Sequence, residues 1–236
     1  MIMRPVAEDW QRAMTIVAHP DDLEYGASTA VAKWTAAGKS VVQVLATRGE
    51  AGIDSMEPAE VMRIRTAEQI AAAEAVGVST VEFLDQPDGM LEYGLPLRRL
   101  IAQAIRRHRP EVVVSLNFRE TWGAGQGFNM ADHRSLGLAV ADAVRDAANR
   151  WVFRDLAEEA WQGVRFALFA GSPNAEHYVD VTGHLEAGIA SLTAHQVYFN
   201  GLSQDFDPTG FLTHMTATMG EQAGVTHAVT FELIEL

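Results

Sequence analysis

The chain has 236 residues, no cysteine and a formal net charge of −13 at pH 7. The lack of cysteine excludes disulfides, thiolate nucleophiles and cysteine-based metal sites, so a metal would have to be held by His, Asp or Glu. The negative charge argues against nucleic acid or an anionic membrane surface as the main partner, and a neutral or weakly charged small molecule suits it better.

The first predicted element is an apolar run, residues 14–18, that ends abruptly in His19, Pro20, Asp21 and Asp22. The run predicts a strand of a parallel sheet, and the proline with the acidic pair suits the first turn of a helix. These side chains should therefore gather at the carboxyl edge of the strand, where α/β sheets bind ligands. A neutral imidazole and a carboxylate three residues later can ligate zinc, which leaves Asp21 free for proton transfer. The alternative is that Asp21 or Asp22 only caps a helix and His19 is an ordinary strand-end residue.

Strand and helix patterns then alternate along the chain. Further predicted strands cover residues 41–46, 80–84, 111–116, 165–170, 177–181 and 226–234. Predicted helices cover residues 24–38, 58–77, 95–108, 132–148, 185–198 and 209–222. This alternation is typical of an α/β protein with a parallel sheet. We expect one domain, residues 1–236, with a core over 14–150 and a C-terminal extension over 151–236.

Three polar features accompany these elements. Arg65 and Glu68 lie three residues apart on one helix, where a surface ion pair of little energetic consequence is the commoner interpretation. The arginines of the helix at 95–108 are expected to form a solvated face. The polar turn at residues 47–52 follows a strand and should border the same cleft as His19.

A long loop, residues 117–131, precedes the helix that Asp132 and His133 open. Loops of this length inside compact domains are usually functional. The glycines at residues 123–127 invite a nucleotide-binding hypothesis, but they adjoin neither the strand nor the helix as a phosphate-binding turn requires, so we interpret them as a mobile lid or substrate loop. His133 begins a helix that follows a strand and should reach the rim that carries His19, where it can supply a third metal ligand. The alternative is an unremarkable histidine at the start of a helix.

The motif His19-Pro20-Asp21-Asp22-Leu23-Glu24, preceded by Ala18, resembles the signature of the PIG-L or LmbE-like family of zinc-dependent N-deacetylases. The resemblance covers most of the chain and continues through Thr47-Arg48-Gly49-Glu50, Arg65-x-x-Glu68 ahead of Val76-Gly77-Val78, Pro87-Asp88-Gly89, Asp132-His133-Arg134, Ala194-His195 and Gly224-Val225-Thr226-His227. It implies a Rossmann-like three-layer α/β fold with a mostly parallel sheet and no nucleotide cofactor.

The resemblance also implies the roles of individual residues. His19, Asp22 and His133 would ligate Zn²⁺, with another divalent metal as an alternative, and Asp21 would be the general base. Two histidines and one aspartate leave zinc an open position for water. On the substrate side, Arg65 and His227 would reach the substrate and Asp88 is a further candidate. Family members typically remove acetyl groups from substrates that contain N-acetylglucosamine, so the implied partner is a small N-acylated molecule such as an amino sugar or a glycoside.

One position departs from the family pattern. The family usually has a histidine three residues before the third ligand, where this chain has Met130. Methionine cannot donate a hydrogen bond to a developing oxyanion, and the loss of one such donor slows a reaction by roughly 10²–10³. Candidate replacements are His227, His195, Asn129 and Asn117. Met130 follows Phe128 and Asn129 in a loop with a tryptophan, which suggests an apolar wall for a hydrophobic part of the substrate.

Three functions are compatible with these residues. The first is a zinc-dependent hydrolase of N-acetyl or other N-acyl amides. The second is a metal-binding homologue without catalysis, or with a regulatory role, which Met130 favours. The third is a nucleotide-dependent enzyme, which the position of the glycines disfavours. No basic N-terminal segment with a long apolar stretch and no membrane-spanning pattern occurs, so we expect a cytoplasmic protein, and a homo-oligomer remains open.

Overall fold

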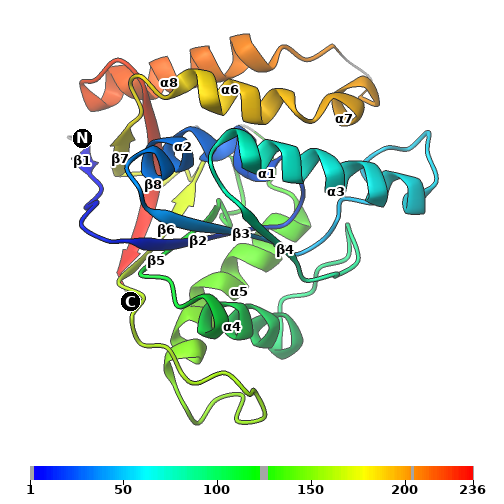
Figure 1. Cartoon of the computed structure of the whole chain (residues 1–236), viewed down its shortest axis with the longest axis vertical. Helices are drawn as coiled ribbons and strands as arrows, with labels where there is room; N and C mark the ends of the chain where they lie inside the picture. Colours follow the sequence, from blue (N-terminus) through cyan, green and yellow to red (C-terminus); the bar gives the residue numbers. More distant parts are fainter. Residues whose placement is uncertain (1–2, 123–126, 203–204, 236) are drawn as a thin grey trace.

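The computed structural model describes residues 3–122, 127–202 and 205–235, and within them one sheet is flanked by helices (Figure 1). The strands are β1 Arg4–Pro5, β2 Arg12–Val17, β3 Ser40–Leu45, β4 Thr80–Phe83, β5 Val112–Leu116, β6 Phe166–Ala170, β7 His177–Asp180 and β8 Ala228–Glu235. The helices are α1 Asp22–Gly26, α2 Ser28–Ala36, α3 Pro58–Ala75, α4 Leu95–His108, α5 Ala131–Ala148, α6 Leu185–Thr193, α7 Gln196–Asn200 and α8 Pro208–Ala223. Residues 123–126 of the predicted glycine loop lie outside the described residues.

The sheet has the strand order β1-β7-β8-β6-β5-β2-β3-β4. From β2 the chain adds β3 and β4 on one side and then returns to add β5 and β6 on the other, all in parallel. The crossing point between β2 and β5 is the place where doubly wound sheets open a crevice at their carboxyl edge. The residues that follow β2 therefore lie where a ligand site is expected.

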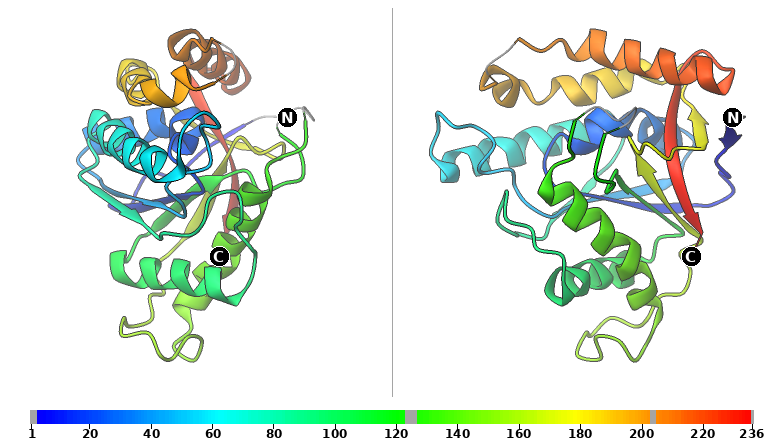
Figure 2. Two further views of the ribbon diagram at one scale, coloured as in Figure 1. Left: turned by 90° about the vertical axis from the view of Figure 1, so that its right-hand side faces the viewer. Right: turned by 180° about the vertical axis from the view of Figure 1, so that it is seen from behind.

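Helices cover both faces of the sheet, which confirms the predicted three-layer α/β fold. In Figures 1 and 2, α4 and α5 lie on one face and α1, α2 and α3 on the other, and α6 packs on α2 and α3 from outside. Each face buries its own apolar cluster. One contains Trp10 and Trp34, whose rings meet edge to face at 5.1 Å, and the other contains Ile101 and Val140. Among the residues that the structure describes, no helix is long and apolar enough to cross a membrane.

The last strand, β8, runs against its neighbours. It lies between β6 and β7 and pairs with both in antiparallel register, with Phe231 opposite Ala170 and Ala228 opposite Asp180. The connection from α8 into β8, residues 224–227, is short, whereas α6, α7 and α8 separate β8 from β7. α8 ends at Gly224, which has a φ of 76°, and the chain enters the sheet from the edge that α8 already covers.

Two predicted helices are each split in the structure. The helix predicted at 24–38 is divided into α1 and α2 at Ala27, whose φ is −147°. Gly26, just before this break, lets the backbone lie close to β5, because a Cβ at that position would lie 2.7 Å from a methyl carbon of Leu116. The helix predicted at 185–198 ends at Thr193, and α7 begins again after His195. Helical periodicity continues across both breaks, so it could not reveal them.

The arginines of α4 are only partly a solvated face, which corrects the sequence expectation. Arg106 is buried and donates hydrogen bonds to the backbone carbonyls of Ala147, Asp146 and Asn149 at the end of α5. The last carbonyls of a helix lack partners within it, so this guanidinium satisfies them. Arg98 also departs from the expectation, since it forms two hydrogen bonds of 2.8 Å to Asp146.

Candidate metal centre and active-site cavity

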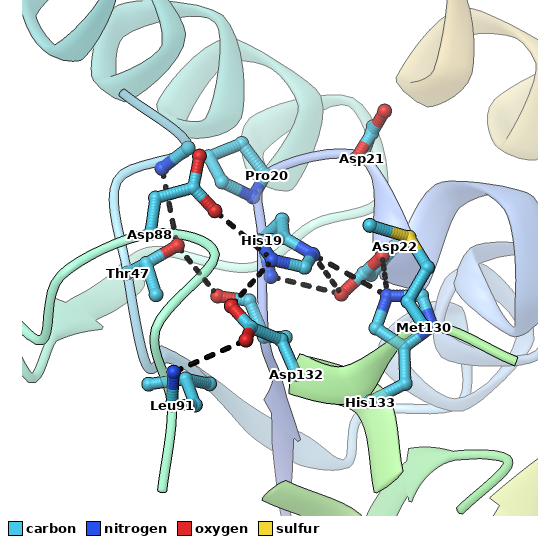
Figure 3. A network of polar contacts seen from close by, with 12 residues as sticks. His19, Pro20, Asp21, Asp22, Thr47, Asp88, Leu91, Met130, Asp132 and His133 are labelled. Carbon is cyan, nitrogen blue, oxygen red and sulfur yellow. Dashed lines mark hydrogen bonds and ion pairs between the residues drawn. The ribbon is translucent and has the colours of Figure 1, made fainter. Parts of the chain in front are cut away.

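The turn after β2 directs two neighbouring carboxylates differently. Asp21 has a φ of 87°, in the left-handed region, where a residue with a Cβ costs about 1–2 kcal/mol and aspartate is one of the better tolerated. α1 begins at the next residue, and in this described segment the Asp21 carboxylate makes no capping hydrogen bond. Figure 3 shows the side chain of Asp22 directed toward His19 and His133, whereas the Asp21 carboxylate points away from them.

Three side chains converge with the spacing of a metal site. His19 Nδ1 lies 3.3 Å from His133 Nε2 and 3.4 Å from Asp22 Oδ2, and His133 Nε2 lies 3.0 Å from Asp22 Oδ1 (Figure 3). Ligand bonds of about 2.0–2.1 Å in a tetrahedron place neighbouring ligand atoms about 3.3 Å apart. The three residues are at least 94% buried, so solvent contributes little to their arrangement. This donor set of two nitrogens and one carboxylate fits zinc.

Each of the two histidines turns its second ring nitrogen to a fixed acceptor. His19 Nε2 lies 3.1 Å from Asp88 Oδ1 and 3.2 Å from Asp132 Oδ2. His133 Nδ1 lies 3.2 Å from the side-chain oxygen of Asn129. If these nitrogens carry the protons, the lone pairs of His19 Nδ1 and His133 Nε2 both face Asp22. Such outer contacts orient metal-binding imidazoles in proteins generally.

A second acidic group, His19 with Asp88 and Asp132, is also compact enough to be considered for a metal. Its carboxylates are already occupied by backbone donors. Asp132 accepts hydrogen bonds from the N–H groups of Gly89 and Leu91, at 2.8 and 3.1 Å, and Asp88 accepts one from Ala51 at 2.8 Å. These two residues therefore support His19, and the group of His19, Asp22 and His133 is the better candidate centre.

The charges at the candidate centre stabilise one another. Burial by itself would lower the pKa of His19, but the negative charge of Asp22 and the hydrogen bonds to Asp132, Asp22 and Asp88 outweigh it and raise that pKa well above its ordinary value. Burial would raise the pKa of Asp22, but the positive charges of His133 and His19 hold it well below its usual range. Asp22 is therefore ionised across the physiological range and ready to bind a cation.

Asp21 lies against a buried guanidinium. Arg65 donates hydrogen bonds to Asp21 Oδ1 at 3.1 Å and to the backbone carbonyls of Gly49 and Pro20. Burial raises the pKa of Asp21 to about 6, with Arg65 acting in the opposite direction. The expected surface ion pair of Arg65 with Glu68 was wrong, because Arg65 is 2% exposed and Glu68 instead accepts a hydrogen bond from a backbone N–H of α7. Gly49 is required here, since a Cβ would lie 2.2 Å from Arg65 Nη1.

A cavity of about 1070 Å³ opens beside these residues. All of the predicted site residues except His227 line it, including Arg65, Asp88 and Met130. The turn after β3 borders the same cavity through Ala51 and Gly52, as predicted. The edges of β5, β6 and β8 and one face of α8 complete the walls.

The four candidate replacements for the missing histidine do not reach this cavity. His227 binds Thr216 on α8 through Nδ1 at 3.0 Å, and His195 is fully buried 3.7 Å from Glu24. The Asn129 amide donates to the backbone carbonyl of Asn117 at 2.7 Å, and neither asparagine lines the cavity. Among the described lining residues, the neutral side chains with N–H or O–H donors beside the candidate centre are Tyr25, Tyr198 and Trp122.

Sequence reasoning missed three residues that hold the site together. Asp132 supports His19, and Asn129 supports His133. Gln69, buried on α3, accepts a hydrogen bond from the backbone N–H of Asp21 at 3.1 Å and donates one to Glu24 at 3.0 Å. Asn129 and Asp132 lie four and one residues before His133 in the sequence. This closeness is the one signal that could have identified them as supporting residues.

Known proteins resemble this chain in sequence and in fold. The profile of the PIG-L family, described as GlcNAc-PI de-N-acetylase, matches residues 14–144. A 1D-myo-inositol 2-acetamido-2-deoxy-alpha-D-glucopyranoside deacetylase from Kineococcus radiotolerans is 30% identical to this chain, over 78% of this chain and 68% of its own length. This relative is by name a deacetylase, which is a hydrolase of N-acetyl amides.

Solved structures share the fold. The N,N'-diacetylchitobiose deacetylase from Pyrococcus horikoshii matches 97% of this chain and 85% of its own, with a TM-score of 0.84 and 22% identity. GalB, the 4-carboxy-2-hydroxymuconate hydratase from Pseudomonas putida, matches 96% of this chain and 97% of its own, with a TM-score of 0.75 and 18% identity. The sequence profile covers β2 to α5 with the whole candidate centre, so this chain belongs to the PIG-L family.

Proposed function

We propose that the protein is a zinc-dependent hydrolase that cleaves the N-acetyl amide of an amino sugar or a related N-acylated small molecule. The observation that carries this proposal is the buried triangle of His19 Nδ1, His133 Nε2 and the Asp22 carboxylate. Three protein ligands leave zinc one open position, which is the arrangement of catalytic zinc sites. Asp21 takes no part in this triangle and lines the cavity beside it, so its carboxylate is available for proton transfer.

The roles of the residues follow from their positions. Zinc, when bound, supplies a water of lowered pKa and polarises the amide carbonyl. The Asp21 carboxylate takes a proton from the attacking water, while its hydrogen bond to Arg65 keeps it aligned. The protonated Asp21 then gives that proton to the leaving nitrogen as the C–N bond breaks, so the products are a carboxylic acid and a free amine.

The fold does not decide this reaction by itself. A hydratase shares it with deacetylases, so the proposal depends on the site and on the named relative at 30% identity. The experiment is to purify the protein, measure zinc by elemental analysis, and incubate it with a panel of N-acetylated amines that includes N-acetylglucosamine, with free amine as the readout.

We expect stoichiometric zinc and amine release that stops when a chelator removes the metal and returns when zinc is added. Amine release that survives complete removal of the metal would contradict the proposal. Stoichiometric zinc with no release from any panel member would favour a second candidate, a metal-binding homologue without catalysis. The observation that favours this second candidate is Met130, which lines the cavity where the family usually has a histidine.

Met130→His tests whether this position is a lost donor or part of a binding wall. If it is a lost donor, the variant should gain up to roughly 10²–10³ in kcat on N-acetylglucosamine. We expect a gain in kcat below tenfold. Met130 is half-exposed on the cavity wall, where a flexible apolar side chain suits contact with the substrate better than it suits a catalytic position. Steady-state kinetics on N-acetylglucosamine and on an aromatic N-acyl amine will show this. A large gain on both substrates would mean that Met130 is a damaged catalytic position.

A further inference from the structure

One face of α8 forms an apolar wall of the cavity. Phe211, Met215 and Met219 recur every four residues along this helix and all line the cavity. Because residues four apart lie on the same side of a helix, the three side chains form a continuous stripe. The adjacent side of α8, with Leu212 and Thr216, is buried against the rest of the protein and holds the helix in place. We call Phe211, Met215 and Met219 the α8 wall.

The polarity of this helix face changes with depth. Met215 and Met219 are half-buried and Phe211, at one end of the stripe, is 37% exposed. The polar side chains that line the cavity beside the two methionines, His214, Thr218 and Gln222, are exposed. An apolar centre with a polar rim is the usual anatomy of a surface that buries an apolar partner. Without an apolar partner, the thioethers of Met215 and Met219 would face water inside the cavity.

The rest of the cavity supports the same conclusion. Among the described residues that line it, the carboxylates and the one guanidinium all lie at or beside the candidate metal centre, so the α8 wall adds no formal charge. Tyr25 extends the wall, with its ring 5.4 Å from that of Phe211. The volume of about 1070 Å³ slightly exceeds the roughly 300–1,000 Å³ typical of pockets for drug-sized ligands.

We infer that the substrate carries an apolar group, aryl or alkyl, that packs on the α8 wall while its N-acyl amide lies at the candidate metal centre. This inference rests on the proposed function. The hydroxyl groups of a bare amino sugar would lose hydrogen bonds to water against thioethers and an aromatic ring, whereas an apolar group gains there. Flexible methionines suit apolar groups of varied shape. α8 also lies outside residues 14–144, which the family profile matches, so this wall belongs to the part of the chain that the profile does not describe.

The test measures binding of two amines that differ only in an apolar group. Isothermal titration of the zinc-loaded protein compares glucosamine with its 2-naphthyl glycoside. We expect the naphthyl amine to bind about 10- to 100-fold more tightly, the factor that corresponds to burying on the order of 100 Å² of apolar surface. Equal affinities for these two amines, together with equal affinities for N-octanoylglucosamine and N-acetylglucosamine, would overturn the inference.

Substitutions in the α8 wall test whether the preference for the naphthyl amine arises there. The double substitution Met215→Gln with Met219→Gln should reduce the preference below about fivefold and leave the zinc content unchanged. Met62→Gln is the matched control, because Met62 is exposed on α3 and does not line the cavity. It should retain the full preference. A preference that survives in the double variant would contradict the assignment, and circular dichroism of both proteins checks that the fold is intact.

A second comparison identifies which half of the substrate is apolar. Asp21→Asn should slow hydrolysis enough to measure binding of the intact amides N-octanoylglucosamine and N-acetylglucosamine. A preference for the octanoyl compound, without one for the naphthyl glycoside over its parent sugar, assigns the wall to the acyl chain. Amine binding requires no turnover, so the two proposals can fail separately. A naphthyl preference without any hydrolysis would contradict the proposed function alone. Hydrolysis without any apolar preference would contradict this inference alone.

Discussion

Asp21→Asn is expected to retain stoichiometric zinc and to lower kcat by about 10²–10⁴, the contribution typical of a general base. The substitution removes the basic oxygen but changes little else. Asparagine tolerates the left-handed φ of 87° at this position, and its side-chain oxygen can still accept the hydrogen bond from Arg65. Elemental analysis and steady-state kinetics on the same preparation separate the two effects.

Asp85→Asn is the matched control for this result. Asp85 also has a positive φ, 52°, and its carboxylate pairs with Arg48 at 2.6 Å, but it is an exposed residue outside the cavity lining. The same exchange there should leave zinc content and kcat unchanged. Parent-level turnover by Asp21→Asn would show that the base lies elsewhere and that Asp21 serves only the turn.

His133→Ala and Asp22→Ala are each expected to weaken zinc binding by more than about 100-fold. Loss of an outer contact to a ligand already costs about 10- to 100-fold, and these substitutions remove a ligand itself. The Asp22 change also removes one of the carboxylates that raise the pKa of His19, so a proton competes less with the metal for that imidazole. The loss of the ligand oxygen outweighs this gain in zinc affinity. Zinc retained after dialysis against a chelator of known affinity gives the measurement.

His214→Ala is the control for metal loss, because His214 lines the same cavity from α8 without contacting the centre. It should retain parent-level zinc affinity. Full zinc retention by both His133→Ala and Asp22→Ala would mean that the metal is held by another group, and Asp132→Ala would then test the set of His19, Asp88 and Asp132.

The fold class and the centre of the site could be predicted because their signals are local. The apolar run that stops at His19 encodes a strand end, and a helix that opens with His133 after another strand reaches the same rim in any parallel sheet. The convergence of the three candidate ligands, His19, Asp22 and His133, on one rim therefore follows from the order of the elements. The structure brings their ligand atoms within 3.0–3.4 Å of one another.

The remaining parts depend on contacts between distant segments. Arg65 is buried because the loop at Gly49 folds over it, and helical periodicity within α3 contains no trace of that loop. Asp132 supports His19 because α5 packs against β2 and β5, and β2 lies far from it in the sequence. The α8 wall lies beside the cavity because α8 packs on β8 and α6, and the helical pattern within α8 does not identify those partners.

The position of β8 also sets the order in which the molecule can be completed. In the described chain, β7 pairs with the rest of the sheet only through β8, and β1 pairs only with β7. Neither strand can therefore join the sheet before β8, the last strand, is in place. The candidate centre, His19, Asp22 and His133, is held by strands and helices that precede β8 in the chain. Those strands, such as β2, β3 and β5, pair with one another without β8. Since synthesis delivers the N-terminal part first, a nascent chain is expected to bring its candidate metal ligands together while the cavity still lacks α8. With zinc bound there as proposed, the metal would enter the protein before the substrate-binding wall is complete.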